Sequence, residues 1–386
     1  MDKTRKSPAR LRFSSVESVI EDIRLGRMAI VTDNEERENE GDLVMAAEKV
    51  TAEAINFMTI HGRGLICVPT TSERLQQLGV EPMVTANRES HRTAFMVSVD
   101  AREGITTGIS AHDRARTIWL MADPRSQPHD LVQPGHIFPL QAKSGGVLER
   151  AGHTEAAVDL ARLGGLSAAG VICEILNPDG TMARFAQLLK FARKHKLKIC
   201  SIEELIAYRR VRERLVEKIE EVELPTPYGK FKLHAYRSLV DGQIHVALVH
   251  GKISPQRAEL VRVHAENVAS DVFHSTLFHT EGIMDLSMRA IAAAGAGVLV
   301  YIRHDGWGPV TMPEERVRQT RLKGKPAVRD ISHYLRSYGV GAQILVDLGL
   351  KKIKLLTNQP KKVVGLEGFG IKIVAQIPLL PKTRRS

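Results

Sequence analysis

Six carboxylates crowd into the ten-residue stretch DNEERENEGD, which runs from Asp33 to Asp42 around a single arginine, Arg37. Like charges this close raise one another's pKa and destabilise a loop, and a divalent cation removes that cost. Oxygen ligands on a flexible, glycine-terminated loop suit Mg²⁺ or Mn²⁺, which keep water molecules that substrate oxygens can replace. The stretch is therefore interpreted either as a metal site or as a solvated acidic loop.

Three later stretches add groups that a metal-dependent reaction would use. VQPGHIFPL contains His136, and the apolar stretch GVICEIL contains Glu174. RAGHTEAAVDL begins with Arg150 and leads through His153 into a helix, with Thr154 placed to cap it. A helix start beside an arginine is suited to phosphate, and a neutral imidazole there can ligate a metal. Taken singly, His136 and Glu174 are also explained as structural residues.

Alternating helices and strands must position these groups. Ser14 or Ser15 can cap a helix with apolar residues at helical spacing, and the apolar run MAIVTD follows as a strand. The same order recurs twice, in TAEAINFMTIHGRG before GLICVPT and in GHTEAAVDLARLGG before GVICEIL. This alternation predicts an α/β fold, although the strand order stays open.

The composition fits two globular domains. A chain of 386 residues exceeds the usual size of one core, and 43% hydrophobic residues exclude a mainly disordered chain. No apolar run is long enough for a membrane span or a secretory signal, so we expect a cytoplasmic protein that does not contact membranes. The three cysteines, Cys67, Cys173 and Cys200, are too scattered for disulfides or a cysteine zinc site.

The net charge of +11 comes entirely from the second half of the chain. Residues 1–208 carry 26 Lys/Arg against 27 Asp/Glu, so residues 209–386 hold the whole basic excess. Two halves of opposite character indicate two domains with different ligands, the basic one suited to phosphate or polyanions. A solvated basic surface is the alternative.

The domain boundary is expected near residue 209. Ser201 and Glu204 form a capping-box pattern, and a charged segment predicted as helical follows, up to LPTP. Beyond it, GKFKLHAYRSL and GQIHVALVHGKI alternate like an antiparallel pair. The predicted organisation is a flexible basic N-terminus at 1–11, a first domain at 12–208, a charged helical linker at 209–223 and a second domain at 224–386.

The first domain resembles 3,4-dihydroxy-2-butanone 4-phosphate synthase, which converts D-ribulose 5-phosphate to the butanone phosphate and formate in riboflavin biosynthesis. The resemblance rests on motifs in the family's order and spacing: RENEGD, HGRGLICV, TTGISAHDRA, PGHIFPL, RAGHTEA and GVICEILNPDGTMARF. It implies an α/β domain, a homodimer and a Mg²⁺-dependent site (Mn²⁺ being the other candidate).

The resemblance also implies roles for individual residues. Glu38 and His153 would hold the metal, and His136 and Glu174 would be the catalytic groups. Substrate contacts would come from Arg37, Glu38, Asp42, Arg150, Ala151, Gly152, His153, Thr154 and Glu174, with Asp33, Glu35, Cys67 and Thr107 as further pocket residues.

The second domain resembles GTP cyclohydrolase II but lacks its zinc ligands. In that family three cysteines hold zinc, and the corresponding positions here are Asn267, Phe278 and Thr280. No cysteine follows Cys200. Because thiolates anchor the zinc and set the acidity of its water, we expect no zinc and no GTP hydrolysis.

Two alternatives stay open for this domain. His264, His274 and His279 cluster where the zinc loop would be, so a bifunctional enzyme with zinc held without cysteines is the second hypothesis. The third is a binding role for the basic half, towards a nucleotide or a riboflavin-pathway protein. Scattered lysines without an aromatic stacking platform do not favour nucleic acid.

Overall fold

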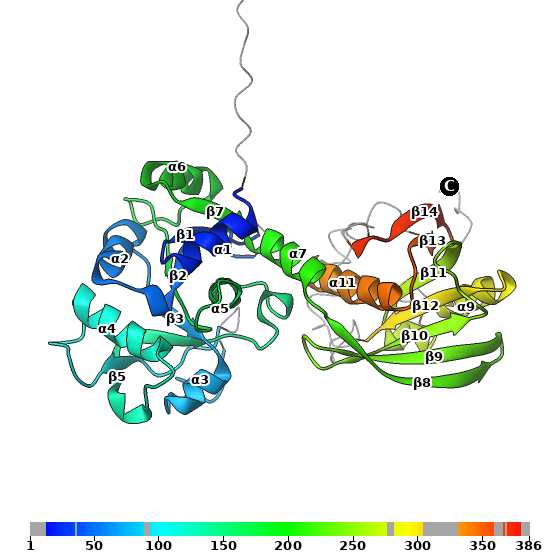
Figure 1. Ribbon diagram of the computed structural model, residues 1–386, viewed down its shortest axis with the longest axis horizontal. Coiled ribbons are helices and arrows are strands. Elements are labelled where there is room, and N and C mark those ends of the chain that lie inside the picture. Colours follow the sequence, from blue (N-terminus) through cyan, green and yellow to red (C-terminus); the bar gives the residue numbers. More distant parts are fainter. Residues whose placement is uncertain are drawn as a thin grey trace, which may run out of the picture. The chain divides into compact units, whose positions relative to one another are not determined.

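The chain folds into two compact units, Met1–Arg209 and Arg210–Ser386 (Figure 1). Among the residues described, no helix is both long and apolar enough to cross a membrane. The predicted flexible segment 1–11 lies outside the described residues, as do Glu35, Phe278, His279 and Thr280. The computed structural model describes residues 13–34, 37–88, 93–275, 282–303, 331–358, 366 and 369–379, of which 331–338 are described as backbone alone.

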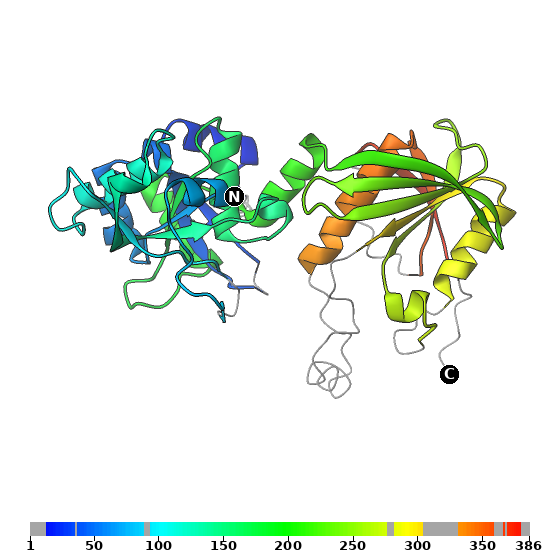
Figure 2. The same cartoon turned by 90° about the horizontal axis from the view of Figure 1, so that it is seen from below.

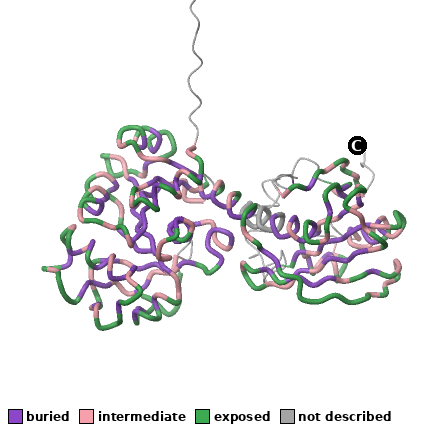
Figure 3. The backbone as a smooth tube through the Cα atoms, in the orientation of Figure 1, coloured by how far each residue is buried: buried purple, intermediate pink, exposed green. Residues whose placement is uncertain are grey.

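In its described residues, the first unit is built on one mixed seven-stranded sheet of order β4-β5-β3-β6-β2-β1-β7. The pairs β1/β7 and β3/β5 are parallel and the other neighbours are antiparallel. Its central strands are buried (Figure 3). The strands are β1 Ala29–Thr32, β2 Gly41–Ala46, β3 Cys67–Thr70, β4 Val99–Ala101, β5 Leu131–Gln141, β6 Gly170–Glu174 and β7 Lys198–Ser201.

Helices and short helical turns connect these strands. Ser15 caps the first helix by accepting the Ser18 N–H, as the sequence predicts. The helices are α1 Val16–Arg24, α2 Ala52–Phe57, α3 Ser72–Gln77, α4 Ala111–Ala122, α5 His153–Leu163, α6 Phe185–His195 and α7 Ile202–Arg212. The turns are η1 Ala47–Lys49, the π-helical η2 Met58–Gly62, η3 Pro128–Asp130 and η4 Gly146–Leu148.

Helix α5 packs directly on the central strands β1, β2, β3 and β6. Its alanines allow this approach: a Cβ at Gly170 of β6 would lie 2.6 Å from the Cβ of Ala157. Small residues on both sides let the helix lie close to the sheet. The first residue of α5, His153, is therefore held at a fixed depth beside the strand ends.

The second unit has a seven-stranded sheet of order β14-β13-β11-β12-β10-β9-β8 within the described part of the chain. Strands β8, β9, β10 and β12 are antiparallel neighbours, whereas β12, β11, β13 and β14 run parallel. Helices α9 and α11 pack on β11 and β12 (Figure 2). The bounds are β8 Val216–Thr226, β9 Gly229–Ser238, β10 Ile244–His250, β11 Ala258–Ala265, β12 Gly297–Ile302, β13 Lys352–Leu356, β14 Lys372–Ile377, α8 Val268–Asp271, α9 Ile283–Ala293 and α11 Ile331–Asp347.

The α/β prediction is confirmed, but the predicted helical linker at 209–223 is helical only as far as Arg212 and is wrong beyond it. Helix α7 ends at Arg212, and residues 216–226, including the first proline of LPTP, form the edge strand β8. Its charged residues pair across to β9, with Lys232 Nζ 2.8 Å from Glu221. Cross-strand partners of this kind override local helix preference.

Candidate functional site

Asp42 and Glu174 lie side by side on neighbouring strands of the first sheet. β2 and β6 are antiparallel with Asp42 opposite Glu174, so the two side chains share one face of the sheet. Glu174 Oε2 accepts the backbone N–H of Leu65 at 2.8 Å. A Cβ at Gly64 would lie 2.6 Å from the Glu174 carbonyl oxygen, so only glycine permits this close approach. The Glu174 carboxylate is therefore held in place.

The register of β3 extends this row to His136. Cys67 on β3 lies opposite both Phe138 of β5 and Ile172 of β6. On the parallel strand β5, His136 precedes Phe138 by two residues, and on the antiparallel strand β6, Glu174 follows Ile172 by two residues. Both residues therefore lie towards the start of β3, and we call Asp42, Glu174 and His136 the row.

His136 has a buried acidic partner that the sequence analysis missed. Asp100 Oδ2 lies 2.6 Å from His136 Nδ1, and Asp100 Oδ1 accepts the His136 backbone N–H at 3.0 Å. Because a carboxylate accepts hydrogen bonds, Nδ1 donates and Nε2 is left for proton transfer. Gly108 adjoins the pair, since a Cβ there would lie 2.6 Å from Nδ1. Thr107, one residue earlier, is exposed on the same loop.

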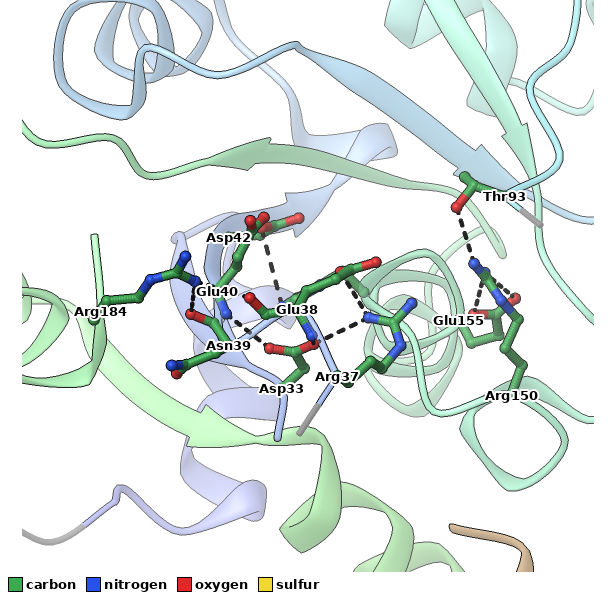
Figure 4. A network of polar contacts seen from close by, with 11 residues as sticks. Asp33, Arg37, Glu38, Asn39, Glu40, Asp42, Thr93, Arg150, Glu155 and Arg184 are labelled. Atoms are coloured by element: carbon green, nitrogen blue, oxygen red, sulfur yellow. Dashed lines mark hydrogen bonds and ion pairs between the residues drawn. The ribbon is translucent and has the colours of Figure 1, made fainter. Parts of the chain in front are cut away.

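The acidic loop is organised by Asp33 (Figure 4). Its carboxylate accepts the backbone N–H groups of Glu38 at 2.9 Å and Glu40 at 2.8 Å. Arg37 donates to both Asp33, at 3.1 Å, and the Glu38 carboxylate, at 2.6 Å. Only 1% of the Asp33 side chain is exposed. Asp33 therefore shapes the loop, and its oxygens are already used by N–H donors.

One cluster in the described residues has donor atoms suited to a metal ion. Asp33, Glu38 and His153 offer ligand atoms that all lie within 4.8 Å of one another. His153 Nδ1 is 3.5 Å from Glu38 Oε2, and Nε2 is 4.0 Å from Asp42 Oδ1. These last two atoms are buried without a hydrogen-bond partner. Two unsatisfied buried atoms across such a gap, among carboxylates, fit a hard divalent cation.

Burial and crowding shift the pKa values around this gap. Burial raises the pKa of Asp42 to about 7, and the carboxylates of Glu174, Glu38 and Glu40 add to the rise against the opposing His153. Burial lowers the pKa of His153, but the Asp42, Glu38 and Asp33 carboxylates outweigh it and raise the value to about 9. A metal ion requires the neutral imidazole, so its binding must release this proton.

The start of α5 forms a basic end of the site. Arg150 donates to Glu155 at 3.0 Å and to Thr93 at 3.0 Å. A Cβ at Gly152 would lie 3.2 Å from Arg150 Nη1 and 3.4 Å from Arg37 Nη2, so two guanidinium groups flank Gly152. Gly152, the cap residue of α5, has no side chain that could accept the free N–H groups of the first turn. An uncapped helix start between arginines suits an anion.

The prediction that Thr154 caps this helix is wrong. The helix begins at His153, the cap position is Gly152 in an extended conformation, and Thr154 is buried in the first turn. The reason is Glu155, whose carboxylate folds back toward Arg150 and the Lys143 N–H. A Cβ at Gly152 would lie 2.7 Å from that carboxylate.

Comparisons with known proteins agree with one another. Residues 17–208 match the 3,4-dihydroxy-2-butanone 4-phosphate synthase family, and residues 217–378 match GTP cyclohydrolase II. Riboflavin biosynthesis protein RibBA of Aquifex aeolicus is 53% identical over 376 residues, which are 95% of this chain and 93% of the relative. RibBA of Bacillus mycoides is 48% identical over 377 residues, 96% and 95% of the two chains. The chain belongs to the RibBA family.

Two solved structures have folds similar to that of this chain. RibBX of A. baumannii, described as a two-domain 3,4-dihydroxy-2-butanone 4-phosphate synthase, is 43% identical with a TM-score of 0.80, covering 94% of this chain and 99% of that chain. A 3,4-dihydroxy-2-butanone 4-phosphate synthase in complex with two magnesium ions is 44% identical with a TM-score of 0.50, covering 52% and 98%. The resemblance drawn from the sequence motifs is thus confirmed for both domains.

Arg184 is a second residue that the sequence analysis missed in this RibBA-family site. Its Nη1 donates to the backbone carbonyls of Glu38, at 2.8 Å, and Asn39 (Figure 4). Asn39 has the left-handed φ of 55°. The contact clamps the acidic loop from 146 positions away in the chain. The only signal in the sequence is the position of Arg184 within the motif GVICEILNPDGTMARF.

Cys67 and Ala151 are the remaining expected pocket residues in the described part of the chain. Cys67 is buried on β3, and burial followed by the nearby Glu174 and Asp42 carboxylates raises the pKa of its thiol. A thiol that stays protonated acts here as a packing group behind the row. Ala151 is half-buried beside Gly152.

The second domain of this RibBA-family chain has a hydrogen-bonded cluster beside the first expected zinc-ligand position. The Asn267 side chain caps α8 by accepting a backbone N–H. His264, buried on β11, lies 2.9 Å through Nε2 from Asp271, which also accepts the Tyr301 hydroxyl at 2.9 Å. His274 adopts a left-handed φ of 50°. The Nε2 atom of His264 is thus already used within the protein.

Proposed function

We propose that this chain converts D-ribulose 5-phosphate to 3,4-dihydroxy-2-butanone 4-phosphate and formate, and that its second domain does not hydrolyse GTP. The observation that carries the first part is the row of Asp42, Glu174 and His136 beside the Glu38–His153 gap. It puts proton-transfer groups next to a set of ligands for a hard cation.

Glu38 and His153 would hold Mg²⁺ or Mn²⁺, with Asp42 facing the same gap. When bound, the ion stabilises the negative charge that develops on adjacent substrate oxygens after a proton leaves carbon. Asp33 and Arg37 keep Glu38 in position by fixing the loop.

The side chains of the row would move protons. Glu174, held by the Leu65 N–H, would take a proton from the carbon next to the substrate carbonyl. Asp42, whose pKa is raised by burial and by the neighbouring carboxylates, would be a further acid–base group. His136 Nε2, oriented through Asp100, would serve the far end of a five-carbon substrate. The phosphate would lie at the start of α5 near Arg150.

The proposal for the second domain rests on missing ligands. The chain has no cysteine after Cys200, so the zinc-binding thiolates of the cyclohydrolase family are absent. Asn267 and His264 are engaged in capping and in the contact with Asp271. RibBX, similar over 94% of this chain, is likewise described as a two-domain synthase.

The deciding experiment gives the purified protein each substrate alone. Ribulose 5-phosphate or GTP is incubated with Mg²⁺, with and without added zinc, and formate is followed by mass spectrometry. We expect formate from ribulose 5-phosphate only. No formate from it would refute the synthase, and formate from GTP would refute the silent second domain. Replacing Mg²⁺ with Mn²⁺ in the same assay compares the two ions.

A direct metal measurement tests the bifunctional alternative. If imidazoles held zinc, the purified protein would contain about one zinc per chain, and His264→Ala would remove it. We expect less than a tenth of that amount by atomic emission in both proteins. Stoichiometric zinc lost on substitution would favour the alternative.

Asp100→Asn should lower kcat by about 10²–10⁴-fold, because an amide can present its N–H to Nδ1 and favour the wrong tautomer. The binding of ribulose 5-phosphate should change little. The ¹⁵N chemical shifts of His136 should report the tautomer change directly. Asp130→Asn, at the last residue of the η3 turn, is the matched control and should keep full activity. Wild-type kcat in Asp100→Asn would contradict this role.

Arg184→Gln should raise the Mg²⁺ concentration for half-maximal activity by about 10- to 100-fold, the usual effect of losing a group that supports metal ligands. Excess Mg²⁺ should restore much of the activity of Arg184→Gln. The Mg²⁺ requirement of Arg184→Lys should fall between those of the wild type and Arg184→Gln. Arg193→Gln, exposed on α6, is the control. An unchanged Mg²⁺ requirement would show that the clamp does not position Glu38.

A further inference from the structure

The HGRGLICV motif contains two side chains that the synthase site does not use. Its glycines are explained by packing, since a Cβ at Gly62 would lie 2.8 Å from Cys173 Sγ and Gly64 lies against Glu174. His61 and Arg63, by contrast, line a cavity of about 120 Å³ between η2, the segment after β6, and α6. This volume is that of about four water molecules, enough for a phosphate group.

The lining of this cavity is basic and contains no carboxylate. Arg63 and Lys194 are exposed cations, and none of the basic lining groups forms an ion pair within the described chain. Amide side chains from Asn177 and Gln187 complete the polar wall, and the Asn177 amide nitrogen already donates to Thr181 and Met182. An open pocket with two cations, two imidazoles and no negative charge suits an oxyanion. The polar lining groups are His61, Arg63, Asn177, Gln187, Lys194 and His195.

Two imidazoles and an aromatic ring form one wall of the cavity. The rings of His61 and His195 are 4.7 Å apart, and Phe191 lies 4.5 Å from His195. Such faces pack well against a flat or apolar group attached to the oxyanion. The wall therefore suits an organic phosphate in addition to inorganic phosphate.

The backbone around the cavity is irregular in two places. η2 is a π-helical turn, and Arg63, which ends it, has a left-handed φ of 70°. Both features are uncommon and concentrate at functional sites. They turn the Arg63 side chain to the Leu176 carbonyl, 3.2 Å away, at the mouth of the cavity.

The cavity also adjoins the catalytic row. Ile175 lines it, while the preceding residue, Glu174, points to Gly64 and the Leu65 N–H on the other side of the strand. Arg63 forms a β-bridge with Ile175. An occupant that draws on Arg63 would therefore act on the segment that holds Glu174.

We propose that this cavity, which we call the HGRG pocket (residues as given above), binds a phosphate monoester. We propose further that its occupancy changes the kcat of the reaction in which Glu174 takes part. The binding part does not depend on the proposed synthase reaction. The kinetic part rests on it.

The test uses the full-length chain and three probes: inorganic phosphate, glycerol 3-phosphate and phenyl phosphate. Isothermal titration compares wild type, the pocket variant Lys194→Gln/His195→Gln and the control Lys190→Gln/Arg193→Gln, at two exposed residues of the same helix. We expect the pocket variant to lose at least tenfold in affinity for one site per chain, with the control within twofold. Phenyl phosphate should bind more tightly than glycerol 3-phosphate because of the aromatic wall.

Equal binding by wild type and pocket variant would overturn the proposal. Circular dichroism and Tm should be alike for the two double variants, and Arg63→Gln repeats the test from the other wall. Kinetics at saturating ribulose 5-phosphate measure the coupling, and because this substrate is itself a phosphate monoester it would also fill the pocket of the wild type. A kcat that differs at least twofold between the wild type and the pocket variant, with the control double variant unchanged, supports the coupling. The same kcat in all three proteins overturns the kinetic part alone.

Discussion

Glu174→Gln should lower the rate of formate release from ribulose 5-phosphate by about 10²–10⁴-fold, the usual contribution of a positioned acid–base group. The amide oxygen can still accept the Leu65 N–H that holds the wild-type carboxylate at 2.8 Å. The change thus removes the proton acceptor and keeps the shape of the site. Initial rates measured over a range of substrate concentrations separate kcat from KM, and we expect the loss in kcat.

The control for this substitution is Glu53→Gln, an exposed glutamate in the first turn of α2. It carries the same change of charge and should keep wild-type kinetics. The Tm of both variants should stay close to that of the wild type. A Glu174→Gln enzyme within tenfold of wild-type kcat would show that another group takes the proton.

His153→Ala and Glu38→Ala should each abolish formate release and remove the effect of Mg²⁺ on stability. In the wild type, Mg²⁺ at a hundred times its Kd should stabilise the fold by about 2.7 kcal/mol. The physical reason is the gap between His153 and the Glu38 and Asp42 carboxylates, which loses a ligand in either variant. Thermal unfolding with and without Mg²⁺, followed by differential scanning fluorimetry, gives this stabilisation directly.

His112→Ala, exposed on α4, serves as the control and should keep both activity and the Mg²⁺-dependent rise in Tm. Circular dichroism should show folded protein for all three variants. Activity that persists in both His153→Ala and Glu38→Ala would refute the assigned ligands. A retained rise in Tm with lost activity would instead place the ion elsewhere.

Local signals in the sequence were sufficient for several elements. Ser15 caps α1, and Ser201 and Glu204 form the predicted capping box, because both depend on residues three positions apart. The alternating stretches after residue 228 form the antiparallel pair β9/β10, as expected for half-buried strands joined by a short loop. The α/β class followed from the same periodicities.

Strand pairing and contacts between residues far apart in the chain decided the rest. The segment predicted as a helical linker became β8 because β9 supplies partners for its backbone and charges. The partnership of Asp100 with His136 spans 36 positions, and that of Arg184 with Glu38 spans 146. No sequence pattern predicts that an aspartate or an arginine will contact a residue at such a separation.

The sequence by itself determined which chemical groups this protein has: the acidic loop, the histidines, Glu174, and a second domain without the thiolates that zinc needs. The tertiary structure decided how those groups are used. The pairing of four strands brought Asp42, Glu174 and His136 towards the same end of β3, and packing of α5 on the sheet set the depth of His153. Strand pairing and close packing depend on residues far apart in the chain, so local sequence patterns do not contain them.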